Sequence, residues 1–172
     1  MRQTSRTADT VAWADRGHSL RPAMDAYSRL LKPVLFRLDA ELAHNLVIAG
    51  MRAAVPFAGL MARMCAVQDP VLVQRVWGRE FANPIGLAAG LDKNGVAIET
   101  LAACGFSHVE IGTVTGQGQT GNPQPRLFRL IPDQAVINRM GFNNRGATEV
   151  AARLAARYAS TRPPCVLGIN LG

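Results

Sequence analysis

The stretch Ile85-Gly-Leu-Ala-Ala-Gly-Leu-Asp-Lys93-Asn94 decides the fold, because a short apolar strand runs directly into small residues, an acid and a lysine. The residues after it, Asn94–Cys104, are predicted to form a helix, and the same order then repeats along the chain. The further elements are a strand over Val109–Thr113, a helix over Arg145–Tyr158 and a strand over Val166–Asn170. Strands that alternate with helices form right-handed units around a parallel sheet, so we predict an α/β fold.

The chain divides into three parts by sequence pattern. Residues 1–23 are polar and aperiodic, and we interpret them as a disordered leader. Residues 24–68 carry apolar residues at helical spacing, and Asp39 is a natural cap for the second of these helices. Residues 69–172, which start with a predicted hairpin, form the α/β part. The helical part either covers the next domain or lies on a membrane, and the pattern alone favours the cover.

A long excursion, Thr115–Asn144, separates the second strand from its helix. Gly116, Gly118 and Gly121 spell G-x-G-x-x-G, the fingerprint of dinucleotide binding. The residues that follow are Asn-Pro-Gln-Pro, which cannot open a helix, so no helix N-terminus is available for a pyrophosphate. We therefore expect a flexible loop at these glycines.

Composition narrows the class of partner. The chain has a net charge of +7, with 17 Arg against 2 Lys, which favours an anionic partner such as nucleic acid, anionic lipid or a phosphorylated ligand. No run of Arg alternates with aromatic residues, so we expect no nucleic acid. Cys65, Cys104 and Cys165 share no metal-like spacing, and we expect reduced thiols and no metal site. No stretch of about 18 uninterrupted apolar residues occurs that could span a membrane.

Polar residues at strand ends are the candidate site. Lys93, Thr113 and Asn170 each follow or close a predicted strand, and in barrel enzymes that end carries the chemistry. The segment from Asn138 to Asn144 holds three asparagines, whose amides match the alternating carbonyls and N–H groups of a pyrimidine-dione ring. The alternatives are a solvated Lys93 and an Asn144 that merely caps the following helix. His44 is taken alone as a packing or surface residue.

Five motifs, in this order, resemble those of dihydroorotate dehydrogenases. They are Gly86-Leu-Ala-Ala-Gly-Leu-Asp-Lys93, Glu110-Ile-Gly-Thr-Val-Thr115, Gly121-Asn-Pro-Gln-Pro-Arg-Leu-Phe-Arg-Leu130, Ile137-Asn-Arg-Met-Gly-Phe-Asn-Asn144 and Gly168-Ile-Asn-Leu-Gly172. The helical part, with Glu41-Leu-Ala-His44, resembles class 2 of that family, which reduces a membrane quinone. The resemblance covers about residues 27–172.

The resemblance implies a (β/α)8 TIM barrel that carries FMN at its strand ends, of which about three strand–helix units lie in this chain. Its FMN contacts correspond to Ala89, Gly90, Leu91, Asp92, Lys93, Thr113 and Asn170. Its orotate contacts correspond to Lys93, Asn138, Arg139, Met140, Gly141 and Phe142. His44 and Arg129 correspond to polar groups that line the quinone tunnel of the family.

The implied activity is the oxidation of (S)-dihydroorotate to orotate in de novo UMP synthesis, with a membrane quinone as the acceptor. The serine base of class 2 enzymes is expected beyond Gly172, so this chain contains no catalytic base by the resemblance. We therefore expect a truncated chain that is inactive alone, peripherally bound to an anionic membrane surface on its cytoplasmic face. The alternative is a non-enzymatic remnant that only associates with the membrane. Because the quinone is lipid-soluble, the resemblance also favours membrane contact for the helical part. It further leads us to expect that removing residues 1–55 abolishes quinone reduction alone.

Overall fold

The computed structural model describes residues 27–172, so the predicted leader, residues 1–23, lies outside the described residues. The described residues fall into two units, one that ends at Leu38 and one that comprises Asp39–Gly172. In the first unit a π-helix, η1 (Tyr27–Leu31), leads into the short helix α2 (Lys32–Leu35). Pro33 lies in the first turn of α2, where its missing N–H costs no hydrogen bond, and it therefore opens a short helix.

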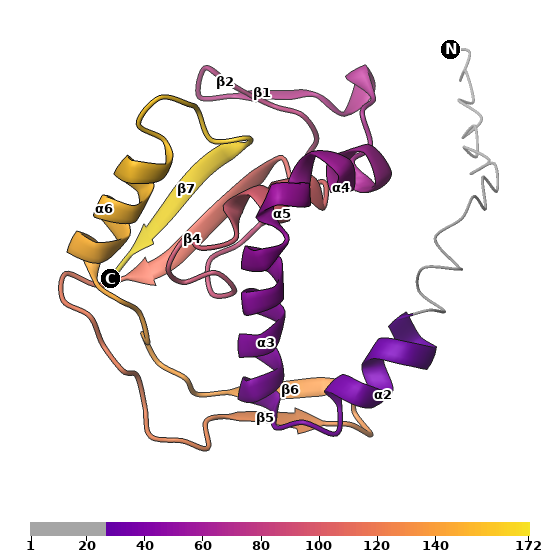
Figure 1. The fold of residues 1–172 in the computed structure, drawn as a ribbon, viewed down its shortest axis with the longest axis vertical. Coiled ribbons are helices and arrows are strands. Elements are labelled where there is room, and N and C mark those ends of the chain that lie inside the picture. Colours follow the sequence, from indigo (N-terminus) through magenta and orange to yellow (C-terminus); the bar gives the residue numbers. More distant parts are fainter. Residues whose placement is uncertain (1–26) are drawn as a thin grey trace, which may run out of the picture. The chain divides into compact units, whose positions relative to one another are not determined.

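A three-stranded parallel sheet forms the centre of the second unit (Figure 1). Its order is β3 (Gly86–Leu87), β4 (His108–Val114) and β7 (Val166–Leu171). The helices α5 (Ile98–Ala103) and α6 (Ala147–Arg157) connect these strands. The core consists of the buried residues Ala97, Ile98, Leu101, Val109, Ile111, Val114 and Val150. The predicted α/β arrangement with parallel strands is thus confirmed.

Two consecutive helical segments, with a bend between them, precede the sheet. The first, α3 (Ala40–Ala53), begins at Asp39, whose carboxylate accepts hydrogen bonds from the backbone N–H groups of Glu41 and Leu42 at 2.9 and 3.0 Å. The second comprises η2 (Val55–Phe57) and α4 (Ala58–Cys65), and it bends away from α3 by 53°. Within residues 27–172 no single helix is long and apolar enough to cross a membrane, whereas this bent pair reaches that length and composition together.

Between these helices and the sheet lie η3 (Pro70–Leu72) and the predicted hairpin, formed by β1 (Gln74–Val76) and β2 (Arg79–Phe81). The two strands pair antiparallel around Trp77 and Gly78. The prediction of a hairpin at this point is therefore confirmed.

The excursion after β4 contains a hairpin that the sequence pattern did not indicate. Its strands are β5 (Leu127–Leu130) and β6 (Ala135–Asn138), which pair antiparallel (Figure 1). The sequence of β6 is Ala-Val-Ile-Asn, and all four residues are exposed. The strand therefore lacks the alternation of apolar and polar residues that identifies a half-buried strand. The glycine stretch opens no helix, as predicted, but it is not a flexible loop: Gln119 pairs with Asn144 through two backbone hydrogen bonds of 2.9 and 3.0 Å.

The helix predicted from Asn94 begins four residues later, at Ile98, because Asp92 holds the preceding turns in another conformation. The Asp92 side chain is buried, and its carboxylate accepts hydrogen bonds from the backbone N–H groups of Asn94, Val96 and Ala97 at 3.3, 3.0 and 2.8 Å. A carboxylate that binds three N–H groups replaces the first helical turn as the partner of these donors.

A buried ion pair joins α3 to the excursion. The Arg126 Nε and Nη2 atoms donate to the Glu41 carboxylate, at 2.6 Å for the shortest contact, and both side chains are about nine-tenths buried. Nη1 of the same guanidinium donates to the carbonyl oxygens of Thr120 and Asn122 at 2.6 and 2.8 Å. Helix α3 is also held by Thr100 of α5, whose hydroxyl donates to the Met51 carbonyl at 2.7 Å.

The variant Glu41→Ala is expected to lower the free energy of unfolding by about 3–5 kcal/mol, because it leaves a buried guanidinium without its counter-charge. The hydrogen bond from Arg126 lowers the pKa of the Glu41 carboxyl below its ordinary value of 4.5. The folded pKa is therefore below the unfolded one. The contribution of the pair is complete above the unfolded pKa and is lost as the pH falls through the folded pKa.

Urea titrations of the wild type and of Glu41→Gln between pH 7 and pH 3 test this. The wild type should lose more stability over that range. Glu80→Ala is the control, since Glu80 pairs with Arg75 on the surface and its loss should change stability by at most about 1 kcal/mol. Parallel pH profiles for the wild type and Glu41→Gln would contradict the expectation.

The variant Asp92→Ala is expected to lower the free energy of unfolding by at least about 1–3 kcal/mol, because it leaves buried N–H groups without an acceptor. Hydrogen exchange should locate the change, with faster exchange at the Val96 and Ala97 amides. Asp133→Ala, at an exposed position in the β5–β6 turn, is the matched control. Unchanged protection at Val96 and Ala97 would show that the carboxylate does not hold this loop.

Candidate functional site

The C-terminal ends of β3, β4 and β7 meet at one edge of the sheet and carry the predicted cofactor residues. The Thr113 hydroxyl donates to the Asn170 Oδ1 atom at 2.5 Å, which joins β4 to β7. The Gly90 N–H, just after β3, donates to the Gly112 carbonyl at 2.9 Å. The structure therefore brings together polar groups from three strand ends, as the sequence predicts for a site at this edge.

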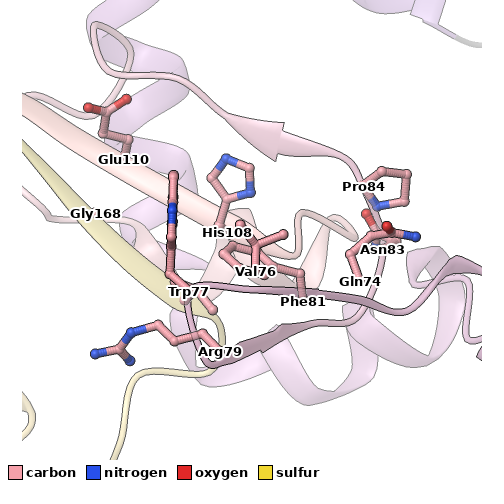
Figure 2. A pocket seen from close by; sticks show the side chains of 11 residues that line it. Gln74, Val76, Trp77, Arg79, Phe81, Asn83, Pro84, His108, Glu110 and Gly168 are labelled. Atoms are coloured by element: carbon pink, nitrogen blue, oxygen red, sulfur yellow. The ribbon is translucent and has the colours of Figure 1, made fainter.

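Glu110 is a member of this cluster to which the sequence analysis gave no role. Its carboxylate accepts from the Ala89 N–H at 3.4 Å and from the Asn170 Nδ2 atom at 3.5 Å. Figure 2 shows Glu110 and His108 of β4 among the side chains that line a cavity of about 590 Å³. The hairpin of β1 and β2 lines the same cavity. The signal for Glu110 was a charged residue between the apolar Val109 and Ile111, where a carboxylate needs polar partners.

Gly112 allows β4 and β7 to approach closely. Its φ is +110°, and a Cβ atom there would lie 2.5 Å from the Asn170 carbonyl oxygen. No other residue type fits this position without moving the backbone of β7. The close approach sets the distance between Thr113 and Asn170.

Neighbouring residues of the loop after β3 make different contacts. Leu91 packs against the hydrophobic core, and the buried Asp92 carboxylate is engaged by the loop backbone. Lys93 extends in another direction: its Nζ atom donates to the Gly141 carbonyl at 3.0 Å and to the Asn143 Oδ1 atom at 2.5 Å. The structure therefore joins Lys93 to the asparagine-rich segment, 48 residues further along the chain.

Electrostatics around Lys93 favour binding of an anion. Burial lowers the pKa of its ammonium, the charge of Arg126 lowers it further, and Glu41 partly offsets both. An ammonium has three donors, and two of them are engaged by Gly141 and Asn143. One N–H is left to meet a negatively charged ligand.

The predicted substrate residues form a continuous turn at the end of β6. The Asn138 Oδ1 atom accepts from the Met140 N–H at 2.9 Å, which leaves the Nδ2 donors of this exposed side chain without a partner among the described residues. Met140 is buried and anchors the turn, whereas Phe142 is exposed. Gly141 adopts φ +71°, the conformation that turns its carbonyl toward Lys93.

Asn144 does not cap the following helix, contrary to the sequence interpretation. Helix α6 begins at Ala147, and the residue in the N-cap position is Gly146. The buried Asn144 amide instead joins the residue after β4 to the turn: Oδ1 accepts from the Thr115 and Gly146 N–H groups, and Nδ2 donates to the Phe142 carbonyl at 2.6 Å. Asn144 therefore positions the asparagine-rich segment from behind.

The two predicted quinone residues lie on α3 and β5, two elements that contact each other. His44 is half-buried in α3, and burial together with the charge of Lys93 lowers the pKa of its imidazole. The histidine is therefore close enough to Lys93 for their charges to interact. Arg129 lies in β5, the strand that α3 contacts. Within residues 27–172 no group of three His, Cys, Asp or Glu side chains is arranged to hold a metal ion.

The sequence of this chain is similar to one family of known proteins. The profile of the family described as dihydroorotate dehydrogenase matches residues 71–172. Proteins named dihydroorotate dehydrogenase (quinone) are similar: that of Thermobifida fusca is 51% identical over 149 residues, and that of Rhodospirillum rubrum is 52% identical over 149 residues. These matches cover 85% and 87% of this chain and 40% and 38% of the relatives.

A solved structure is similar as well. The crystal structure of ligand-free DHODH from Eimeria tenella aligns with a TM-score of 0.62 and 40% identity over 78% of this chain and 37% of that protein. The chain thus spans about 40% of the length of the curated relatives it matches. With the family profile covering more than half of its residues, the chain belongs to the dihydroorotate dehydrogenase family.

Proposed function

We propose that this chain supplies the N-terminal part of a quinone-dependent enzyme that oxidises (S)-dihydroorotate to orotate in pyrimidine synthesis. Relatives that carry this name are about half identical to it. The observation that supports the proposal most is the contact of Lys93 with Gly141 and Asn143, because it joins a cation to an array of amides at a strand end. We further propose that the parallel sheet is the start of a (β/α)8 barrel.

The strand ends fit FMN as the cofactor. Ala89 and Gly90 present little side chain, and a Cβ atom at Gly90 would meet no atom within 4 Å, so a flat ring has room against the backbone. Thr113 and Asn170 offer a hydroxyl and an amide at the same edge. FMN held there would serve as the hydride acceptor. Leu91 and the engaged Asp92 carboxylate would act by shaping the loop.

The Lys93 ammonium would pair with the carboxylate of the substrate. Dihydroorotate carries that carboxylate on a ring with alternating carbonyl and N–H groups, and the Asn138 amide can donate to such a carbonyl. Arg139, Met140, Gly141 and Phe142 would enclose the ring from the same turn. We propose that a serine accepts the proton from the substrate, and that it lies in the part of the full-length relatives that this chain does not match.

The front helices are proposed to form the quinone side. Their exposed apolar side chains include Leu42 and Leu46 of α3 and Leu60 and Met64 of α4, together with Phe57 between them. Arg52 and Arg63 lie on the same helices and would meet anionic headgroups. We propose a peripheral position on the cytoplasmic face of the membrane. The second candidate, a remnant that only binds membranes, rests on these exposed apolar residues alone.

The proposed activity is tested in the complete enzyme, which here means residues 1–172 followed by the part that the full-length relatives have in addition. Anaerobic mixing with dihydroorotate should bleach the flavin absorbance, and added quinone should restore it. A complete enzyme that binds vesicles of anionic lipid but shows no bleaching would favour the membrane-binding remnant.

Replacing Lys93 by Ala should weaken orotate binding by about 2–5 kcal/mol, because the partner of a carboxylate is lost in a partly desolvated site. Titration of the flavin spectrum with orotate measures the dissociation constant. Arg145→Ala is a control, since Arg145 is exposed and its side chain has no hydrogen-bond partner among the described residues. An unchanged dissociation constant in a folded Lys93→Ala enzyme would remove Lys93 from the substrate site.

The quinone side is better tested with a point variant than by removing residues 1–55. Such a deletion would leave Arg126 without Glu41 and would therefore disturb the substrate turn as well. His44→Ala in the complete enzyme should slow flavin reoxidation by quinone about 3- to 10-fold, the effect of one lost hydrogen bond to the quinone. Stopped-flow bleaching by dihydroorotate should stay near the wild-type rate. Equal reoxidation rates would exclude His44 from the quinone site.

A further inference from the structure

The turn that would bind orotate is held by the same guanidinium that anchors helix α3. Arg126 lies directly before β5, and it is buried although its charge is permanent. Its side chain binds Glu41 on one side and the Thr120 and Asn122 carbonyls on the other. Its own carbonyl accepts from the Arg139 N–H at 2.9 Å. One residue therefore touches the helix, the glycine stretch and the substrate turn.

Asn122 passes this constraint to the turn. Its backbone N–H donates to the Met140 carbonyl at 3.0 Å, and its Nδ2 atom donates to the Arg139 carbonyl at 2.7 Å. The neighbouring Gly121 lies so close that a Cβ atom there would be 2.3 Å from the Met140 carbonyl oxygen. The position of Asn122 is itself set by Arg126, which holds its carbonyl.

One N–H group and three carbonyl groups of the turn have such partners. The Arg139 N–H and carbonyl bind Arg126 and Asn122, and the Met140 carbonyl binds Asn122. The Gly141 carbonyl is held by Lys93 from the other side. The side chains of the turn that remain exposed are those of Asn138, Arg139 and Phe142. A turn held in this way is preorganised for a ligand and loses little conformational freedom on binding.

We propose that Arg126, held by Glu41, and Asn122 are positioning residues that set the geometry of the orotate-binding turn from the quinone side of the enzyme. The inference rests on the proposed function. Neither residue needs to touch the substrate: Arg126 acts through Asn122, and Asn122 acts through the carbonyls of Arg139 and Met140. A carboxylate on α3 thereby contributes to substrate affinity.

The test uses three variants of the complete enzyme with FMN bound. Asn122→Ala removes the exposed amide and leaves the buried ion pair intact. Arg126→Lys keeps the charge but has three N–H donors in place of five and lacks the planar fork, so it cannot reproduce all the contacts with Glu41 and the two carbonyls. Asp133→Ala, at the turn of the same hairpin, is the matched control. Each variant is measured for its melting temperature, orotate dissociation constant, KM for dihydroorotate and KM for a soluble quinone.

Asn122→Ala is expected to raise the orotate dissociation constant and the KM for dihydroorotate together, by about 3- to 10-fold, the effect of one lost hydrogen bond. The KM for quinone and the melting temperature should stay near the wild-type values. Arg126→Lys should raise the same two constants further. Asp133→Ala should resemble the wild type throughout.

An Asn122→Ala enzyme with wild-type orotate affinity and melting temperature would overturn the inference. So would a variant in which both KM values rise equally, because a general loss of structure has no preference for the substrate. A wild-type complete enzyme that fails to bind orotate would instead refute the proposed function, so the two failures are distinguishable. If Arg126→Lys does not fold, Asn122→Ala alone decides the question.

Discussion

The pairing of Glu41 with Arg126 is the constraint on which the second unit depends. A guanidinium stays charged at any physiological pH, so burying it requires a carboxylate and further acceptors in fixed directions. Glu41 supplies the carboxylate from α3, and the glycine stretch supplies the carbonyls of Thr120 and Asn122. Parts of the chain that lie 85 residues apart are thereby locked at one point. Hydrophobic burial alone could not fix them so narrowly, because it has no preferred direction.

A second network organises the strand ends in a similar way. Glu110 lies between the backbone of Ala89 and the amide of Asn170, and Asp92 holds the loop that begins the connection to α5. Both carboxylates bind backbone or amide donors instead of cations. The site edge thus keeps Lys93 as a partly buried positive group, and burial and the nearby Arg126 lower its pKa.

Much of this fold could be predicted from the sequence, because the strand–helix alternation is a local signal. The strands β3, β4 and β7 and helix α6 appear within a few residues of their predicted positions. The hairpin of β5 and β6 could not be predicted in this way, since the apolar Val136 and Ile137 are both exposed and give no alternation. The start of α5 was misjudged because Asp92 satisfies amides that a helix would otherwise leave to its cap.

The candidate site residues also differ in whether a local sequence signal indicates them. Lys93, Thr113 and Asn170 could be singled out as candidates because a polar residue at the end of an apolar strand is visible in one segment, and their roles remain predictions. Glu41 and Arg126 could not be assigned roles, since charged residues in a sequence do not reveal which of them are buried together. The misassignment of Asn144 has the same origin: its partner Thr115 is 29 residues away.

The lowered pKa of Lys93 also has a chemical consequence. A lysine with a lowered pKa holds a larger share of its amine in the neutral form, which is the nucleophilic form. The chain contains only two lysines, Lys32 and Lys93, whereas its other cationic side chains are arginines that do not acylate. Covalent probes directed at amines therefore have very few side-chain targets on this surface. In the proposed substrate site, a weakly electrophilic ester that carries a pyrimidine-dione ring would be held near this amine, and the mass of the adduct would identify the lysine.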